Sequence, residues 1–279
     1  NDDGNYEVVG NLQPYGVYVI EYDHSPSPTV TKEWFRPAED AWLCAPTIAD
    51  LDSSDTFEVI LSGGFESDLY VWESDGKTFQ AAVDSSGVYG TVSGGAEYNY
   101  GHVAVGEFDT TSDGLEIIQT LGPKNDSGDC RARVTCWATD DVSGSQLWTT
   151  EIGDLTYLTL STPVIGNIHD ADDELEVVVA RRAADDEIYQ TGGIWLVDDE
   201  GVVVDSVETM DLFLRVEPAP VPVLVERGDG DDDLEVFIAD GREGDNEGDW
   251  STLLELFYWE ADGSTGTSDS TTISDTLPI

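Results

Sequence analysis

The stretch ADLDSSDTFEVIL, residues 49–61, places an acidic loop in front of a glutamate and a run of β-branched and apolar residues. The same order of loop, glutamate and apolar run occurs four more times. The other copies are DDGNYEVVG (2–10), TTSDGLEIIQ (110–119), DADDELEVVV (170–179) and GDDDLEVFIA (230–239). Glu58, Glu116, Glu176 and Glu235 are spaced by 58, 60 and 59 residues, and Glu7 precedes Glu58 by 51. A period of this size indicates a repeat architecture.

Each repeat reads as four strands. Short apolar runs before the acidic loops predict buried first strands at 45–50, 102–107, 162–167 and 222–226, and the run after each glutamate is the second strand. Alternating aromatic segments predict third strands at 16–23, 68–76, 133–141, 193–201 and 254–263. More polar fourth strands follow at 29–35, 145–152, 202–207 and 269–274. No segment has helical spacing of its apolar residues, so we expect an all-β protein.

Four strands per repeat is the make-up of a propeller blade. The period predicts one β-propeller domain over residues 1–279, with five blades. Their approximate bounds are 1–42, which lacks its first strand, 43–101, 102–160, 161–217 and 218–279.

The segments ADLDSSDTFEVIL and GNIHDADDELEVVV (166–179) resemble FG-GAP or VCBS repeats of the integrin-α-like β-propeller. The resemblance covers all five repeats and implies that the first strand of each blade is innermost. Ala49, Gly106 and Gly166 would then lie where blades crowd toward the axis, or they are ordinary small residues at strand ends. Pro278 and Ile279 begin a strand that closes a five-bladed ring, or the chain is an excerpt of a longer propeller.

The charge balance is extreme, with 59 Asp and Glu against 11 Lys and Arg and a net charge of -48. The chain should still fold, because 39% of its residues are hydrophobic and they cluster in strand-length runs. Its carboxylates repel over a Debye length of roughly 10 Å at 0.1 M salt but only roughly 3 Å at 1 M. This composition resembles haloarchaeal and other halophilic proteins. Nucleic acid and anionic lipid are unfavourable partners for such a surface.

Three features bear on location. No apolar stretch approaches the roughly 18 residues of a membrane span, and the chain starts at Asn1 without a signal-like segment, which predicts a mature form or a fragment. Cys130 and Cys136 are close enough to form a disulfide, which the sequence leaves open, and Cys44 is expected to be a buried hydrophobe. Asn125 begins a glycosylation acceptor sequence. The cysteines and the acceptor sequence together favour an extracellular or surface location.

The resembled family wraps one Ca²⁺ in an acidic loop of the form D-x-D-x-D-G-x-x-D/E, since a hard cation takes six to eight oxygen ligands. The resemblance implies the ligands Asp50, Asp52, Ser54, Thr56 through its carbonyl, and Glu58. The other loops carry one extra residue and fit less well; their candidates are Glu107, Asp109, Asp113, Glu116, Asn167, Asp172, Glu176, Glu226, Asp229, Asp231 and Glu235. His169 suits Zn²⁺ or Cu²⁺ more than Ca²⁺, which favours a turn residue. Alternatively, the acids only shape a turn and the glutamate locks it by hydrogen bonding.

The loops between second and third strands vary most in length, and variable loops on a rigid scaffold carry recognition. Five of the eight arginines and two aromatic residues lie there; the candidate ligand face is Arg131, Arg133, Arg181, Arg182, Tyr189, Arg242 and Trp250. Arginine and aromatic side chains suit a glycan or an acidic protein partner. Pairing of these arginines with neighbouring carboxylates is the alternative.

Catalysis has little support. His24, His102 and His169 fall in different contexts, and no nucleophile elbow, zinc helix or phosphate loop occurs. We therefore expect a non-catalytic binding or adhesion module of a halophile, exposed outside the cell or on a virion, with no organic cofactor. The alternatives are a structural subunit of a surface layer, filament or virus spike, and a calcium-dependent enzyme that resembles polysaccharide lyases.

Overall fold

The computed structural model describes residues 6–12, 15–23, 26–38, 45–63, 68–77, 79, 88–91, 102–108, 114–122, 131–139, 145–153, 160–168, 174–181, 192–209, 221–225, 234–242, 252–259 and 273–277. These residues form strands and turns and contain no helix, which confirms the all-β class. Accordingly, the described part holds no helix long and apolar enough to cross a membrane.

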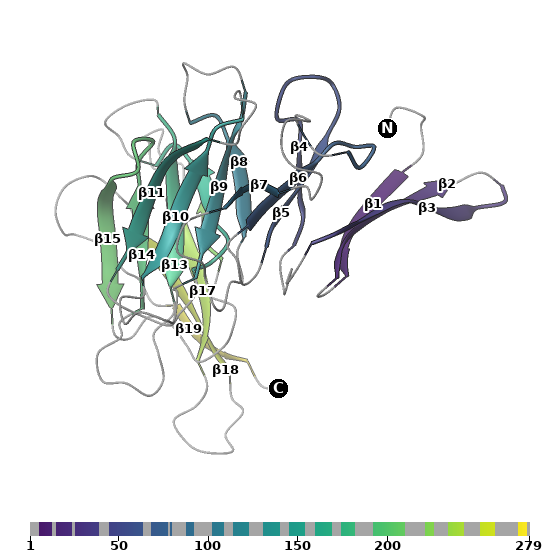
Figure 1. The fold of residues 1–279 in the computed structure, drawn as a ribbon. Helices are drawn as coiled ribbons and strands as arrows, with labels where there is room; N and C mark the ends of the chain where they lie inside the picture. Colours follow the sequence, from purple (N-terminus) through teal and green to yellow (C-terminus); the bar gives the residue numbers. More distant parts are fainter. Residues whose placement is uncertain are drawn as a thin grey trace.

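The strands form five antiparallel sheets, here numbered 1 to 5 in chain order (Figure 1). Sheet 1 has three described strands and the others have four, and within each sheet the strands are neighbours in sequence order. Sheet 1 is β1 (Tyr6–Leu12), β2 (Gly16–Asp23) and β3 (Thr29–Pro37); sheet 2 is β4 (Thr47–Ala49), β5 (Glu58–Ser62), β6 (Asp68–Trp72) and β7 (Val88–Thr91). Sheet 3 is β8 (Val103–Gly106), β9 (Glu116–Leu121), β10 (Ala132–Trp137) and β11 (Gln146–Ile152). Sheet 4 is β12 (Val164–Gly166), β13 (Glu176–Arg181), β14 (Gly192–Val197) and β15 (Val203–Thr209); sheet 5 is β16 (Val223–Val225), β17 (Glu235–Arg242), β18 (Thr252–Trp259) and β19 (Ile273–Leu277).

The predicted strands overlap observed ones, but the third strands of sheets 2 to 5 end four residues before the predicted bounds, at Trp72, Trp137, Val197 and Trp259. Two further differences concern sheets 5 and 2. β19 begins at Ile273, four residues later than expected, because the polar stretch before it has no alternation that could define a start. β7 completes sheet 2 in a segment for which no strand was predicted. The regular register is clearest at the motif glutamates. Glu58, Glu116, Glu176 and Glu235 each pair with the last residue of their sheet's first strand, which is Ala49, Gly106, Gly166 or Val225.

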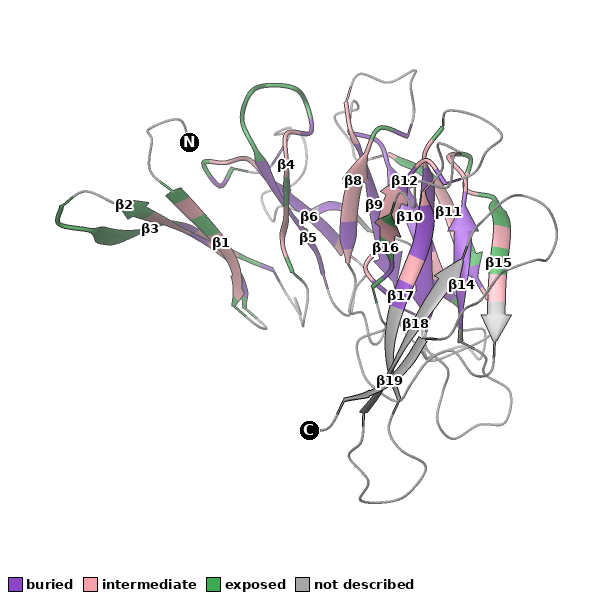
Figure 2. Cartoon of the chain, turned by 180° about the vertical axis from the view of Figure 1, so that it is seen from behind, coloured by how far each residue is buried: buried purple, intermediate pink, exposed green. Residues whose placement is uncertain are grey.

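Consecutive sheets pack face to face through four buried apolar clusters (Figure 2). Between sheets 1 and 2, Val17 and Val19 pack with Val59, Leu61 and Trp72. The other three clusters join sheets 2 and 3, 3 and 4, and 4 and 5 in the same way. The core is therefore divided into layers between sheets, as in other repeat proteins whose units contact only their neighbours.

The first strands of sheets 2 to 5 form a row, with β8 beside β4, β12 beside β8 and β16 beside β12. A side chain at Gly106 would press on Ile165 of β12, and one at Gly166 would clash with Leu224 of β16. Small residues thus lie where neighbouring sheets approach, as expected for Gly106 and Gly166. The described strands do not close into a ring, since sheet 1 lies beyond sheet 2 on the side away from sheets 3 to 5 (Figure 1).

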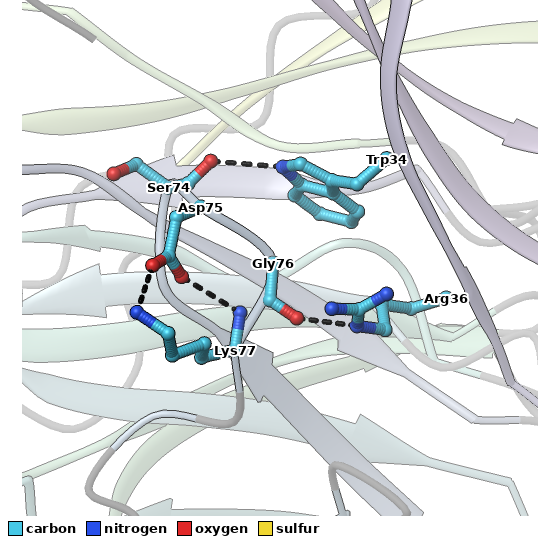
Figure 3. Close-up of polar contacts among 6 residues, drawn as sticks. All are labelled: Trp34, Arg36, Ser74, Asp75, Gly76 and Lys77. Atoms are coloured by element: carbon cyan, nitrogen blue, oxygen red, sulfur yellow. Dashed lines mark hydrogen bonds and ion pairs between the residues drawn. The ribbon is translucent and has the colours of Figure 1, made fainter.

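A second, peripheral contact links sheets 1 and 2. The indole N–H of Trp34 in β3 donates to the carbonyl of Ser74 at 2.8 Å, and the guanidinium of Arg36 donates to the carbonyl of Gly76 (Figure 3). Lys77 in the same turn pairs with Asp75 (Figure 3). Gly76 has φ of +77°, and its Cα faces the Trp34 ring, so this turn requires glycine for two reasons.

The peripheral contact recurs between sheets 3 and 4. Trp148 of β11 donates to the carbonyl of Asp199 at 2.7 Å, and Thr150 donates to the carbonyl of Gly201, which has φ of +81°. Tyr89 of β7 donates in a similar way to the carbonyl of Ala138, which directly follows β10 of sheet 3. Polar contacts between neighbouring sheets therefore recur along the chain, as the apolar clusters do.

Candidate functional site

The acidic loops and the arginine-bearing loops lie at opposite ends of the sheets. Because each sheet is antiparallel in sequence order, its first-to-second and third-to-fourth connections share one end, and its second-to-third connection is at the other. We call these the acid end and the arginine end. The acid end holds the Asp50–Glu58 loop, and the arginine end holds Arg131.

The motif glutamates close the acidic loops from inside. One carboxylate oxygen of Glu58 accepts a hydrogen bond from the backbone N–H of Leu51 at 2.7 Å. Glu116 accepts one from Phe108 and Glu176 one from Ile168, both at 2.7 Å. All three glutamates are buried, so each satisfies a backbone donor that the turn removes from water.

Aspartate side chains shape the loop at 50–58. The backbone N–H of Ser54 donates to both Asp50 and Asp52 at 3.1 Å, and that of Asp55 donates to Asp50 at 3.3 Å. Ser53 and Asp55 have left-handed φ values of 57° and 65°. Asp55 stands at the position of the glycine in the loop pattern D-x-D-x-D-G-x-x-D/E, and it adopts the left-handed conformation that glycine favours and that Asp tolerates better than most residues.

Asp50, Asp52 and Glu58 each offer a carboxylate oxygen, and these oxygens all lie within 4.8 Å of one another. A search of the described residues for clustered acids, histidines and cysteines finds these three as a group that could hold a metal ion. The hydroxyls of Ser54 and Thr56 bond to each other at 2.7 Å. Three of the five predicted ligands therefore converge, while the side chains of Ser54 and Thr56 are engaged with each other.

Electrostatics make the Glu58 position unusual. Its Oε1 atom is buried and has no hydrogen-bond partner, and the residue is fully buried. The pKa of Glu58 is raised from 4.5 to about 7. Burial is the largest cause, the Leu51 hydrogen bond opposes the rise, and the like charges of Asp52, Glu73 and Asp50 add to it. A divalent cation would offset both the desolvation and the like charges, so the donor set fits a hard cation such as Ca²⁺. Glu73, just after β6, is a contributor that sequence reasoning missed.

The remaining acidic loops are described only at their ends. Glu107 and Asn167 lie just after their first strands, and Glu116, Glu176 and Glu235 are buried at the start of their second strands. Asp109, Asp113, His169, Asp172, Glu226, Asp229 and Asp231 lie outside the described residues.

At the arginine end, Arg131 forms an ion pair with Glu151 at 3.0 Å, and about half of each side chain is exposed. Arg133 lies opposite Glu151 in the register of β10 and β11. Burial lowers the pKa of the Arg133 guanidinium, and the Glu151 carboxylate partly opposes this. Both arginines thus lie near the Glu151 carboxylate.

Arg181 was predicted to be part of an exposed ligand face. It is only 1% exposed, however, and does not present its charge at the surface. Its guanidinium lies over the Trp195 ring at 4.9 Å and packs against Gly153, which has no side chain to exclude it. Of the other candidates, Arg182, Tyr189 and Trp250 lie outside the described residues, and Arg242 is the last residue of β17.

The residues considered for extracellular modification are mostly outside the described part. Cys136 is fully buried in β10, opposite Trp148 and Ile118. Cys130, Cys44 and Asn125 lie outside the described residues. The Cys130–Cys136 disulfide and glycosylation of Asn125 therefore stay predictions.

Comparison with known proteins gives little further information. No family model matches the chain, and no curated protein matches it. Among solved structures, the chain is similar to the crystal structure of the V. cholerae biofilm matrix protein Bap1, with 16% sequence identity and a TM-score of 0.38. The match covers 100% of this chain and 60% of that one, so the chain spans less than two thirds of the biofilm protein. A TM-score of this size does not establish a shared fold.

Proposed function

We propose that the chain is a non-catalytic binding or adhesion module of a halophile, exposed outside the cell or on a virion. Its sheets would be the blades of an FG-GAP/VCBS-type β-propeller. The observation that carries the proposal is the repeated packing of five similar sheets, whose second strands end and whose third strands begin at the same end of each sheet. Scaffolds of this kind present recognition loops. The net charge of -48 supports a high-salt environment.

The arginine end is the proposed recognition surface, for a glycan or a surface protein. Arg131 and Arg133 supply planar, multidentate donors in a chain with few basic residues. A glycan array in molar KCl tests this with the double variant Arg131→Ala, Arg133→Ala. The matched control is Lys77→Ala, which removes an exposed cation at the acid end. Loss of binding in the double variant alone supports the proposal, and equal binding by all proteins contradicts it.

We further propose that the acid end binds Ca²⁺ through Asp50, Asp52 and Glu58. The support is their convergence together with the unpartnered, buried Oε1 of Glu58. Ca²⁺ titration followed by thermal melting at fixed KCl tests it, with a chelator-treated sample as reference. The variant Asp52→Asn should lose the calcium-dependent rise in melting temperature, whereas Asp55→Asn in the same loop should keep it. An absence of any calcium effect on the parent chain would contradict the site.

The non-catalytic assignment has its own test. Incubation of the chain with acidic polysaccharides and Ca²⁺ should give no unsaturated products. Accumulation of such products would favour the lyase-like alternative over binding. Isolation of the chain as an ordered assembly would instead favour a structural role.

A further inference from the structure

A second glutamate lies opposite Glu58 where β5 and β6 meet the acid end. These strands pair antiparallel, with Ile60 opposite Val71. Glu58 comes two residues before Ile60 and Glu73 two residues after Val71, so the same register brings Glu73 opposite Glu58. Ile60 and Val71 both pack in the cluster between sheets 2 and 3, and side chains alternate along a strand. The two glutamates therefore belong to the same face of sheet 2 and are cross-strand neighbours.

The cross-strand pair of Glu58 and Glu73 places two like charges together. Like charges directly opposite each other on neighbouring strands destabilise a sheet. Glu58 is fully buried and Glu73 is half-buried, so salt screens their repulsion less than it screens the repulsion between exposed acids. Burial is the largest cause of the raised pKa of Glu58, and the charge of Glu73 adds to the rise. The pair therefore favours a cation at this corner of sheet 2.

Ligands for such a cation are already assembled beside the pair. Asp50, Asp52 and Glu58 bring carboxylate oxygens within 4.8 Å of one another, and Oε1 of Glu58 is buried without a hydrogen-bond partner. Glu73 is not a member of this convergent group, so it adjoins the three carboxylates without completing their cluster. A carboxylate in that place acts on a bound ion through its charge.

Sheet 3 holds the buried side of the loop in place. The backbone N–H of Leu51 donates to Glu58, and the Leu51 carbonyl accepts from the backbone N–H of Leu115 and from the hydroxyl of Thr139, both at 3.3 Å. The Leu51 side chain is fully buried in the cluster between sheets 2 and 3. Because the loop is anchored in this way, a charge next to it keeps a fixed place relative to a bound ion.

Sheets 3 and 4 differ from sheet 2 at this position. By the same register, Ala138 stands opposite Glu116 in sheet 3, and Asp198 stands opposite Glu176 in sheet 4. Sheet 3 thus has no second carboxylate there. In sheet 4, Asp198 accepts a hydrogen bond of 2.6 Å from the backbone N–H of Val202 and so serves its own turn. The like-charge pair therefore accompanies the loop in which three carboxylates converge.

We propose that Glu73 sets the affinity of the Asp50–Glu58 loop for highly charged cations, by adding a fourth negative charge next to the three converging carboxylates. The number of charges around a calcium loop is one of the features that tune its affinity. Coulomb attraction to a fixed carboxylate grows in proportion to the charge of the ion, so Glu73 favours Ca²⁺ over the K⁺ of a high-salt medium. This role rests on the proposed Ca²⁺ site and gives the source of its selectivity.

Isothermal titration calorimetry of the 279-residue chain in molar KCl tests the role of Glu73, with Ca²⁺ and with the trivalent ion Tb³⁺. We expect Glu73→Gln to weaken Ca²⁺ binding about tenfold and Tb³⁺ binding by a larger factor, because the lost attraction scales with the charge of the ion. Glu73→Asp keeps the charge and should keep most of the affinity. The matched control is Asp75→Asn, which removes the same charge from an exposed residue that pairs with Lys77 in the same turn. It should change the affinity by less than about twofold.

The results separate the role of Glu73 from the site itself. A parent chain that binds neither ion overturns the Ca²⁺ site, and the role of Glu73 with it. If the parent chain binds Ca²⁺ and Glu73→Gln binds it equally well, the site stands and the role of Glu73 is overturned. Losses of equal size for Ca²⁺ and Tb³⁺ would also overturn it, since they would show that Glu73 shapes the turn and does not attract the ion.

Discussion

The carboxylate of Glu58 accepts a hydrogen bond of 2.7 Å from the backbone N–H of Leu51, seven residues earlier in the chain. Glu116 makes the same bond to Phe108, eight residues earlier, and again at 2.7 Å. The extra residue of the later loops is therefore absorbed within the loop, while the bond that closes it is kept. This explains how loops of different length join strands of one register.

Replacing the carboxylate of Glu116, which accepts the hydrogen bond from Phe108, should destabilise the fold measurably. Glu116→Gln exchanges a charge-assisted acceptor for a neutral one, and we expect the free energy of unfolding to fall by about 1–2 kcal/mol. Urea unfolding in molar KCl measures it. Glu107→Gln, at an exposed residue of the same loop, should change stability by less than about 0.5 kcal/mol. Equal losses for both variants would show that net charge, and not the loop bond, is responsible.

The raised pKa of Glu58 predicts that the stability of the fold depends on pH. Its pKa rises from 4.5 to about 7 in the folded chain, so between these values the folded state holds a proton that the unfolded state has released. The stabilisation is present below about pH 4.5 and is lost as the pH rises toward 7. Thermal melts from pH 4.5 to 8 without Ca²⁺ should show a smaller decline for Glu58→Gln than for the parent chain. Parallel pH profiles would argue against an elevated pKa.

The turn at Gly76 should not accept a side chain. A Cβ atom there would lie 2.8 Å from the Trp34 ring, and φ is +77°. We expect Gly76→Ala to lower the free energy of unfolding by about 1–3 kcal/mol, since it adds strain and displaces the ring. Ser74→Ala keeps the carbonyl that Trp34 uses and should be nearly neutral. Chemical denaturation compares the two, and a neutral Gly76→Ala would mean that the sheet 1 contact is loose.

Gln119 bridges sheets 2 and 3 through a buried polar contact. Its amide donates to Ser62 at 2.8 Å and accepts from the Trp137 indole at 3.1 Å. Gln119→Leu should cost about 2–3 kcal/mol, because the indole N–H loses its acceptor in the core. The same change at Gln146, which is exposed on β11, is the control. Tryptophan fluorescence during urea unfolding reports both, and similar midpoints would show that Trp137 finds another acceptor.

Much of the fold follows from local pattern. Alternation and short apolar runs predict the strands, and the repeated glutamate predicts their common register, because both signals are contained within a few residues of each strand. The Asp50–Glu58 loop could be singled out for the same reason. The locking role of the glutamates, kept open beside metal binding, is seen at Glu58, Glu116 and Glu176.

Other features depend on residues far apart in the chain. Val8 and Val59 have the same place in the repeat, yet one is half-exposed and the other buried. Val59 packs on sheet 1, whereas none of the described sheets packs on Val8. Arg181 is the last residue of β13 and was predicted from the sequence to lie at the surface. In the structure, Gly153 and Trp195 enclose its side chain. Hydrophobic alternation sets which way a side chain points within its sheet. Whether that side is covered is decided by a neighbouring sheet about fifty residues away, and only the tertiary structure contains that contact.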